Sequence, residues 1–195
     1  MLSYNESLKI LKKTNTLLEG HFILSSGLHS DQYIQCAKLL SYPNEAEGIC
    51  KSLAKKIKNK FKTIDLILSP AIGGIVIGYE IARQLNTQTI FAERMNGSLV
   101  LRRGFSITPD TNVLIVEDVI TTGKSAIECA KLVTQNNANL LGFACLIDRS
   151  NNEVLIKDEI ISQIKFQIKL FKENELPEKL KKIPPIKPGT RTLSK

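Results

Sequence analysis

One continuous stretch of the chain, residues 113–133, combines four local patterns in a fixed order. It begins with four apolar, mostly β-branched residues, which is the pattern of a strand buried on both faces. Two acids, Glu117 and Asp118, come next, and a small hydroxyl-rich turn follows at 121–125. An amphipathic helix is predicted after the turn. Strand, acidic pair, turn and helix form one unit, which favours an α/β fold.

The turn and the acidic pair suit different parts of one ligand. Backbone N–H groups at the start of a helix are unpaired, and the helix dipole there attracts anions. Gly123 lets the backbone approach a phosphate closely, and the hydroxyls of Thr121, Thr122 and Ser125 add donors. Carboxylates repel phosphate, but they accept hydrogen bonds from sugar hydroxyls or hold a metal ion through water. A ribose 5-phosphate offers both a phosphate and a vicinal diol.

Two other interpretations of this stretch are weaker. The letters GKS also occur in a Walker A loop, but that motif requires a glycine five residues before Gly123, where Asp118 stands. An ordinary strand–turn–helix crossover with a capping threonine accounts for the threonines and the glycine. It does not account for two adjacent carboxylates at the end of a buried strand, where an unpaired charge is costly.

Residues 113–125 resemble the signature of the type I phosphoribosyltransferases: four apolar residues, two acids, two mostly apolar residues, Thr-Thr-Gly, any residue and Ser. The resemblance implies that the catalytic carboxylates, Glu117 and Asp118, hold the ribose hydroxyls of 5-phosphoribosyl 1-diphosphate (PRPP). The residues that it assigns to PRPP binding are Glu117, Asp118, Val119, Ile120, Thr121, Thr122, Gly123, Lys124 and Ser125. The signature does not say which base is ribosylated.

Residues 20–37, GHFILSSGLHSDQYIQCA, resemble the amino-terminal hood of the orotate phosphoribosyltransferases, in which a Ser-Gly turn and an aromatic strand cover the base. Many relatives carry a lysine just before the Ser-Gly pair, whereas this chain has Ser25, so the role of that lysine is unassigned. His21 and His29 are the only histidines. A histidine in a turn is more often structural than catalytic, and a ligand-binding role for either stays open.

A second strand–glycine turn–helix pattern occurs around Gly73 and Gly74. The amides at the start of its helix are suited to an anion. The resemblance implies that this turn contacts the diphosphate of PRPP. A tight turn without a ligand is the alternative.

Three arginines, Arg94, Arg102 and Arg103, surround the hairpin signal Asn96-Gly97. The family has a mobile loop here that closes over the diphosphate and often carries an essential lysine, but this stretch contains no lysine. We hypothesise that the arginines bind the diphosphate instead, because a guanidinium makes bidentate phosphate contacts. The alternative is a surface hairpin whose arginines are only solvated.

A further apolar strand, residues 139–147, is followed by Asp148 and Arg149. Open α/β sheets bind ligands at the carboxyl ends of their strands. The resemblance implies that Arg149 meets the orotate carboxylate as a planar fork and that Thr121 contacts the same base. A solvated arginine is again the alternative.

Strands alternating with helices between residues 64 and 147 predict a doubly wound, mainly parallel sheet flanked by helices. We expect a single domain with the type I phosphoribosyltransferase fold over residues 1–195, with a core at about 41–150 and a small hood from about 1–40 and 160–195. The other expected elements are helices at 3–18, 43–61, 75–85 and 175–182 and strands at 64–68, 89–91 and 164–170.

Composition excludes several classes of protein. The hydrophobic share of 43% and charged share of 24% are ordinary for a globular chain, and no apolar run is long enough for a membrane span. No signal peptide is apparent, and the four spaced cysteines are typical of reduced thiols in a cytoplasmic protein. The net charge of +8 permits nucleic-acid binding, but the lysines lack interleaved aromatics, which favours a solvated face. We therefore expect no membrane or nucleic-acid partner.

The resemblance implies one reaction: orotate and PRPP give orotidine 5′-monophosphate and diphosphate. It also implies a homodimer and Mg²⁺ as cofactor, held mainly through PRPP with no direct protein ligand. Three alternatives are a phosphoribosyltransferase for a purine or uracil, a regulator that keeps the PRPP fold but binds RNA or DNA, and a non-enzymatic partner subunit. The metal preference and the residue that replaces the loop lysine are undecided by sequence.

Overall fold

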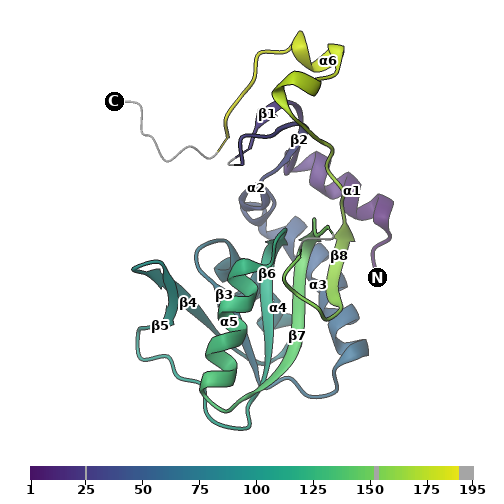
Figure 1. Ribbon diagram of the computed structural model, residues 1–195. Helices are drawn as coiled ribbons and strands as arrows, with labels where there is room; N and C mark the ends of the chain where they lie inside the picture. The colour runs from purple at the N-terminus through teal and green to yellow at the C-terminus, as the bar shows by residue number, and fades with distance from the viewer. Residues whose placement is uncertain (25, 152–153, 189–195) are drawn as a thin grey trace.

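The centre of the molecule is a six-stranded sheet in the order β5-β4-β3-β6-β7-β8 (Figure 1). The computed structural model describes residues 1–24, 26–151 and 154–188. Neighbouring strands are parallel except in the antiparallel hairpin β4–β5. The strands are β3 (Leu66–Pro70), β4 (Gln88–Met95), β5 (Ser98–Leu101), β6 (Asn112–Ile120), β7 (Asn139–Asp148) and β8 (Ile160–Lys165). The mainly parallel sheet expected from the sequence is confirmed.

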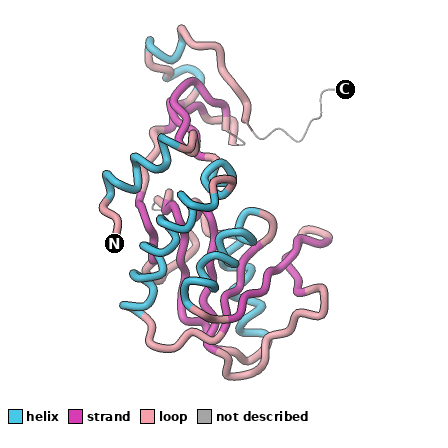
Figure 2. The backbone as a smooth tube through the Cα atoms, turned by 180° about the vertical axis from the view of Figure 1, so that it is seen from behind, coloured by secondary structure: helices cyan, strands magenta, loops and turns pink. Residues whose placement is uncertain are grey.

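Helices cover both faces of this sheet, so its central strands are buried on both sides. The helices of the core are α1 (Tyr4–Lys13), α2 (Cys36–Leu40), α3 (Pro43–Lys60), α4 (Gly73–Leu85) and α5 (Lys124–Gln135). In β6, Leu114 and Val116 pack with α3 and α4, whereas Val113 and Ile115 pack with α5. Figures 1 and 2 show α5 on one face and α3 and α4 on the other. The two-sided burial follows from the unbroken apolar run of β6.

A small hood stands over the edge at which the parallel strands end (Figure 1). Its sheet has the order β1-β2-β9, with both neighbouring pairs antiparallel. Its elements are β1 (Leu17–Ile23), β2 (His29–Ile34), β9 (Leu170–Phe171), the short 3₁₀ helix η1 (Glu173–Glu175) and α6 (Glu178–Lys181). The pairing of β2 with β9 places an amino-terminal segment and a carboxyl-terminal segment in one sheet.

The first helix is shorter than the helix expected at 3–18. Ser3 caps it and forms a capping box with Glu6, as expected of a capping serine. The helix ends at Lys13, and Asn15 follows in the left-handed region with a φ of 52°. Leu17 then begins β1, because pairing with β2 overrides the helical spacing of the leucines.

The alternating segment expected as one strand at 164–170 is divided between two sheets. β8 (Ile160–Lys165) forms the edge of the main sheet, parallel to β7, and β9 lies in the hood. The carboxyl-terminal share of the hood therefore starts after Lys165 and not at residue 160. Alternation of apolar and polar residues predicts which side chains of a strand are exposed. It does not predict which neighbouring strand the segment pairs with.

No helix in the described part of the chain is long and apolar enough to cross a membrane. All four cysteines are buried and free of disulfides.

Candidate active site

The candidate site lies at the carboxyl edge of the main sheet. The parallel strands β3, β4, β6 and β7 all end there. The helix after β3 is α4 and the helix after β6 is α5, and these cover opposite faces. The winding therefore reverses between β3 and β6, and open α/β sheets bind their ligands at such a switch point.

The turn between β6 and α5 has the shape expected of a phosphate loop. Gly123 adopts a φ of 75°, and a Cβ atom there would lie 2.9 Å from the side chain of Ile156. Glycine is thus required both by the backbone conformation and by the space available. Thr121, Thr122 and Lys124 are exposed at the start of α5, where the free N–H groups and the helix dipole favour an anion.

Glu117 and Asp118 lie inside β6 and not after it, because the strand continues to Ile120. Adjacent residues of a strand point to opposite faces. The carboxylate of Asp118 faces α4, where a Cβ atom on Gly73 would lie 2.8 Å from its Oδ2. Glu117 lies on the α5 side, where its charge acts on Cys129. The two acids, expected at the carboxyl end of the strand, therefore lie near that end and point to opposite faces of it.

Both carboxyl groups are half-buried, and neither has a cationic partner among the described residues. Burial raises the pKa of Glu117 to about 8, and the charge of Asp118 adds to this effect. Burial also raises the pKa of Asp118, although the N–H of Val119 donates to its Oδ1 at 2.9 Å and opposes the shift. No lysine or arginine of the described residues forms an ion pair with either acid. The site suits a ligand that brings hydroxyl donors or positive charge.

The glycine turn after β3 lies directly beside this acidic strand. Gly73 contacts Asp118, as described above, and Gly74 is buried. A Cβ atom on Gly74 would lie 3.1 Å from Pro70 and 3.2 Å from Ser69, so the turn packs closely on its own strand. The structure thus brings together the two glycine turns that the sequence pattern singled out.

Arg149 and Thr121 line one cavity of about 540 Å³ between the core and the hood. Its lining residues are Thr121, Arg149, Ser150, Asn151, Gln167, Ile168 and Leu170. The Nε atom of Arg149 is buried and has no hydrogen-bond partner among the described residues. Burial lowers the pKa of Arg149, and the hood residue Tyr33 is one of the groups whose charge acts on it. A buried, unpaired guanidinium N–H is suited to a planar anion.

Several lining residues of this cavity were not identified from the sequence. Gln167, Ile168 and Leu170 follow β8 and reach Arg149 only because the chain turns back into the hood. The alternating pattern at 164–170 indicated a strand, but it carried no signal for a ligand site. Ser150 and Asn151 follow Arg149 directly, and their position after a strand is the one signal that points to them.

Comparison with known proteins identifies the family. Residues 37–178 match the phosphoribosyl transferase domain. The chain is 44% identical to the orotate phosphoribosyltransferase of Chlorobium phaeobacteroides over 185 residues, which is 95% of each chain. It is 45% identical to the orotate phosphoribosyltransferase of Caldicellulosiruptor bescii over 184 residues, or 94% of this chain and 96% of the relative. The chain belongs to the orotate phosphoribosyltransferase family.

Solved structures of lower identity share the fold of this family. The orotate phosphoribosyltransferase of Aeropyrum pernix superposes with a TM-score of 0.66 at 22% identity, covering 81% of this chain and 92% of that one. An adenine phosphoribosyltransferase from Thermoanaerobacter pseudethanolicus superposes with a TM-score of 0.59 at 21% identity, covering 69% and 88%. The fold is thus common to enzymes named for different bases, and sequence similarity places this chain in the orotate family.

The arginines of this family member lie on the β4–β5 hairpin, whose Asn96-Gly97 turn is confirmed. Arg94 donates to the Gly97 carbonyl at 2.6 Å and lies 2.9 Å from a carboxylate oxygen of Glu128. Arg102 and Arg103 both pair with Glu93, the former at 3.1 Å. All three side chains are exposed, and their described contacts are with the hairpin and α5. They do not contact Gly73 or Gly74 in this arrangement.

The two histidines of this orotate phosphoribosyltransferase family member are buried in the hood, at 3% exposure for His21 and 6% for His29. His21 Nε2 lies 2.7 Å from His29 Nδ1, and His21 Nδ1 lies 2.8 Å from the carbonyl oxygen of Ile183. Because a carbonyl only accepts, His21 Nδ1–H is the donor in that bond. The pair therefore ties the β1–β2 hairpin to the carboxyl-terminal segment, which favours the structural role. Ser25 lies outside the described residues.

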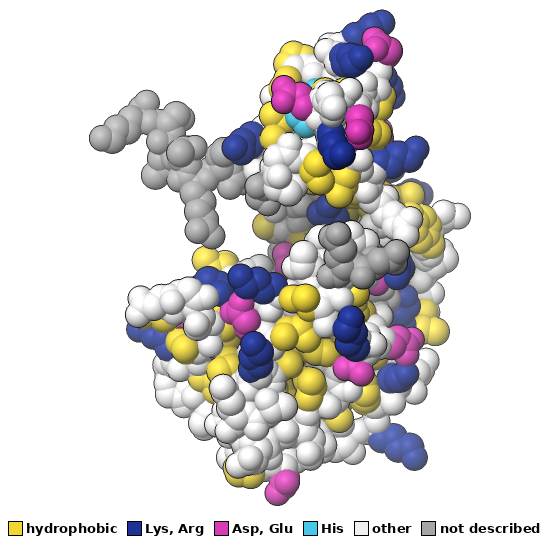
Figure 3. Space-filling model, in the orientation of Figure 1, with side chains coloured by type: hydrophobic (Ala, Val, Ile, Leu, Met, Phe, Trp, Pro, Cys, Tyr) yellow, Lys and Arg dark blue, Asp and Glu magenta, His cyan; other side chains and the backbone are white. Residues whose placement is uncertain are grey.

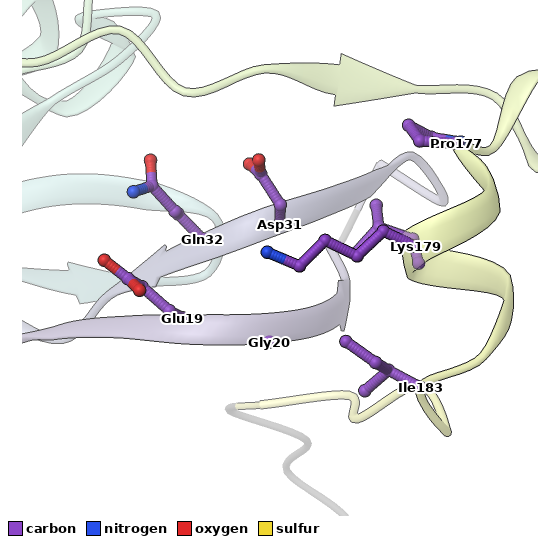
Figure 4. Close-up of a pocket in the computed structure, with 8 residues that line it drawn as sticks. Glu19, Gly20, Asp31, Gln32, Pro177, Lys179 and Ile183 are labelled. Carbon is purple, nitrogen blue, oxygen red and sulfur yellow. The ribbon is translucent and has the colours of Figure 1, made fainter.

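A second cavity, of about 420 Å³, lies within the hood between the β1–β2 hairpin and α6 (Figure 4). Figure 4 shows Glu19, Gln32, Asp31 and Lys179 around it. All its lining residues belong to the hood or to the segment around α6, and none belongs to the phosphate loop or the Arg149 cavity. This cavity therefore lies apart from the site residues that the sequence pattern singled out.

Proposed function

We propose that this protein transfers the ribose 5-phosphate group of PRPP to orotate, giving orotidine 5′-monophosphate and diphosphate. The observation that carries the proposal is the cavity shared by Thr121 and Arg149, where a buried guanidinium N–H without a partner meets the end of the phosphate loop. The orotate carboxylate would supply that partner. Relatives at 41–45% identity carry the name orotate phosphoribosyltransferase, which supports the same base.

In this proposal each part of the site acts by position and charge. The loop from Thr121 to Ser125 holds the 5-phosphate, and Glu117 and Asp118 accept hydrogen bonds from the ribose hydroxyls. Diphosphate leaves the anomeric carbon as the base nitrogen approaches, and ionised Glu117 and Asp118 stabilise the positive charge that develops on the ribose. Burial raises the pKa of Glu117 to about 8 in the unliganded protein, and the positive charge of the ribosyl centre favours its ionised form. No protein nucleophile is needed, so rate enhancement comes from orientation and electrostatic stabilisation.

The acidic strand also fits a magnesium ion that arrives with PRPP. Glu117 and Asp118 are half-buried carboxyl groups without a cationic partner among the described residues, and magnesium prefers oxygen ligands while keeping several waters. Asp118, beside Gly73, is the residue placed to hold the ion through water near the diphosphate turn. When bound, the ion neutralises charge on the leaving diphosphate.

The decisive experiment follows the loss of orotate absorbance with the purified chain, PRPP and Mg²⁺. Adenine, hypoxanthine and uracil are tested in parallel. We expect turnover with orotate and a kcat/KM at least a hundredfold lower for the other bases, since they lack the carboxylate that pairs with Arg149. Turnover with another base and none with orotate would overturn the substrate assignment.

The alternative of a nucleic-acid-binding regulator has little support from the surface. Figure 3 shows lysine and arginine side chains scattered on the visible face and mixed with acidic ones. A basic patch on one face is the usual footprint of nucleic-acid binding. A regulator would show salt-dependent binding to RNA or DNA and no turnover.

We further propose that the arginines of the β4–β5 hairpin bind the diphosphate, in place of the lysine that the family often uses. Glu93 now holds Arg102 and Arg103, so the diphosphate must compete with this carboxylate. We expect Arg102→Ala and Arg103→Ala each to raise the KM for PRPP roughly tenfold, the loss of about one charge-assisted contact.

Steady-state kinetics with PRPP varied at saturating orotate would test this role. Glu93→Gln should lower the KM for PRPP, because it releases both arginines. Lys60→Ala is the control, since Lys60 pairs with Glu159 beside β8, at the edge of the main sheet opposite to β5. Unchanged kcat and PRPP affinity in both hairpin variants would refute the role.

A homodimer is proposed from the exposed apolar stripe on α4 and the residue before it. Ile72, Val76 and Tyr79 are 86%, 50% and 64% exposed and recur at helical spacing. Contiguous exposed apolar residues mark interaction surfaces. The stripe begins at the diphosphate turn, so a second copy packed there would lie beside the active site. The buried free cysteines are typical of a reducing compartment, which supports a cytoplasmic location.

We expect the Val76→Asp variant to be monomeric at protein concentrations where the unmodified chain is a dimer, because a carboxylate buried in the interface would be unpaired. Sedimentation velocity at about 10 μM reports the state. Lys131→Asp, at an exposed position of α5 on the opposite face of the sheet, is the control. A Val76→Asp variant that sediments like the unmodified chain would place the interface elsewhere.

A further inference from the structure

We propose that Asp148 is a positioning residue that aims the Arg149 guanidinium at the base, an inference that rests on the proposed function. Asp148 ends β7 and is 4% exposed. It does not line the cavity shared by Arg149 and Thr121. It lines a neighbouring cavity of about 420 Å³, which shares Ser150, Asn151 and Gln167 with the Arg149 cavity but contains neither Arg149 nor Thr121. Asp148 therefore acts on the base only through the backbone.

Three hydrogen bonds hold the chain on both sides of Arg149. The Arg149 N–H donates to the Ile120 carbonyl at 2.8 Å, which ties it to the end of β6 directly before Thr121. The Ser150 N–H donates to Asp148 Oδ1 at 2.8 Å in a buried contact. The Phe166 N–H donates to the Asp148 carbonyl at 2.8 Å. The bond made by the Asp148 side chain is the one that closes the turn containing Arg149.

The negative charge of Asp148 contributes less to holding the Arg149 turn than the hydrogen bond that its side chain accepts. Its Oδ2 lies 3.6 Å from Lys165 Nζ, and the Lys165 side chain is 62% exposed. The Asp148 side chain is 6% exposed, but the length of the pair and the solvation of the lysine make its contribution small. By contrast, a buried N–H that loses its acceptor has a high desolvation cost, and the turn must move to satisfy it.

Arg149 depends on this turn because its own side chain is poorly anchored. Its buried Nε has no hydrogen-bond partner among the described residues. The direction of the guanidinium is therefore set by the backbone at 148–150 and by packing. A shift of the turn should displace the fork from the orotate carboxylate while leaving the phosphate loop in place.

Two substitutions separate the acceptor from the charge. Asp148→Asn keeps an oxygen acceptor for the Ser150 N–H and loses the charge, so we expect its KM for orotate to stay within about threefold of the unmodified enzyme. Asp148→Glu keeps the charge and displaces the acceptor by one methylene, so we expect its KM for orotate to rise roughly tenfold. The KM for PRPP should change less than about twofold in both. Lys165→Ala is the control and should leave both KM values unchanged.

A double-mutant cycle with Arg149→Ala completes the test. If Asp148 acts through Arg149, Asp148→Glu should have no further effect on orotate binding once Arg149 is removed. Equal rises in both KM values, additive effects in the cycle, or a defect in Asp148→Asn as large as in Asp148→Glu would each overturn the proposal. Absence of orotate turnover in the unmodified chain would instead refute the proposed function, and the cycle would then be run with the base that is accepted.

Discussion

Replacing Arg149 by alanine is expected to lower kcat/KM for orotate about a thousandfold, which corresponds to about 4 kcal/mol of lost interaction. The reason is that Arg149 lies in the cavity shared with Thr121, where its buried Nε has no hydrogen-bond partner in the described part of the chain. An orotate carboxylate left there without a cation would be desolvated and unpaired. Steady-state kinetics with orotate varied at saturating PRPP would measure the loss.

Two controls make this prediction specific. Arg149→Lys retains a charge but not the planar fork, so it should recover about tenfold of the lost activity. The KM for PRPP should stay within about twofold in both variants. The alanine variant should unfold at the same denaturant concentration as the unmodified chain or a higher one, because a buried unpaired guanidinium does not stabilise the unliganded protein. An unchanged KM for orotate would contradict the assignment of this cavity to the base.

Replacing Glu117 by glutamine is expected to lower kcat about a hundredfold while stabilising the unliganded protein at alkaline pH. The activity loss follows from removal of a carboxylate beside the developing positive charge. The stability gain follows because burial raises the pKa of Glu117 from 4.5 to about 8. The folded state therefore holds a proton that the unfolded chain releases, and the unmodified protein loses stability as pH rises from about 4.5 to about 8.

Glutamine does not titrate, so the glutamine variant should avoid this loss. We expect its free energy of unfolding to exceed that of the unmodified chain by up to about 5 kcal/mol at pH 9, with a small difference at pH 5. Urea unfolding at the two pH values measures both quantities. Glu173→Gln is the control, since Glu173 is exposed in the hood. A difference that is the same at pH 5 and pH 9 would show that Glu117 does not titrate in this window.

Much of the core could be predicted because its signals are local. The apolar run of β6, the turn at Gly123 and the Asn96-Gly97 hairpin depend on residues adjacent in sequence, and all three appear where expected. The prediction of a helix at 3–18 was wrong at its carboxyl end, because β1 pairs with β2. The helical spacing of apolar residues carries no information about that pairing. The strand expected at 164–170 failed for a related reason, since its halves pair with different sheets.

In the candidate site, too, some features could be predicted from the sequence and others could not. The phosphate loop and the two acids were identified from one continuous segment, but the placement of Glu117 and Asp118 on opposite faces followed only from the length of β6. Arg149 was identified by resemblance and by its place after a strand. Gln167 and Leu170 line the same cavity as Arg149 because the chain returns to the hood after β8, and this could be known only from the structure.

By itself, the sequence determined the strand–turn–helix unit, the parallel sheet and the family resemblance. These depend on side-chain periodicity and on glycine and hydroxyl groups at fixed spacing, which adjacent residues encode completely. Only the tertiary structure decided which segments enclose the base cavity, which face each acid occupies, and that Asp148 holds the turn of Arg149. The physical reason is that these features arise from hydrogen bonds and packing between residues far apart in the chain, where strand order and helix placement set the neighbours.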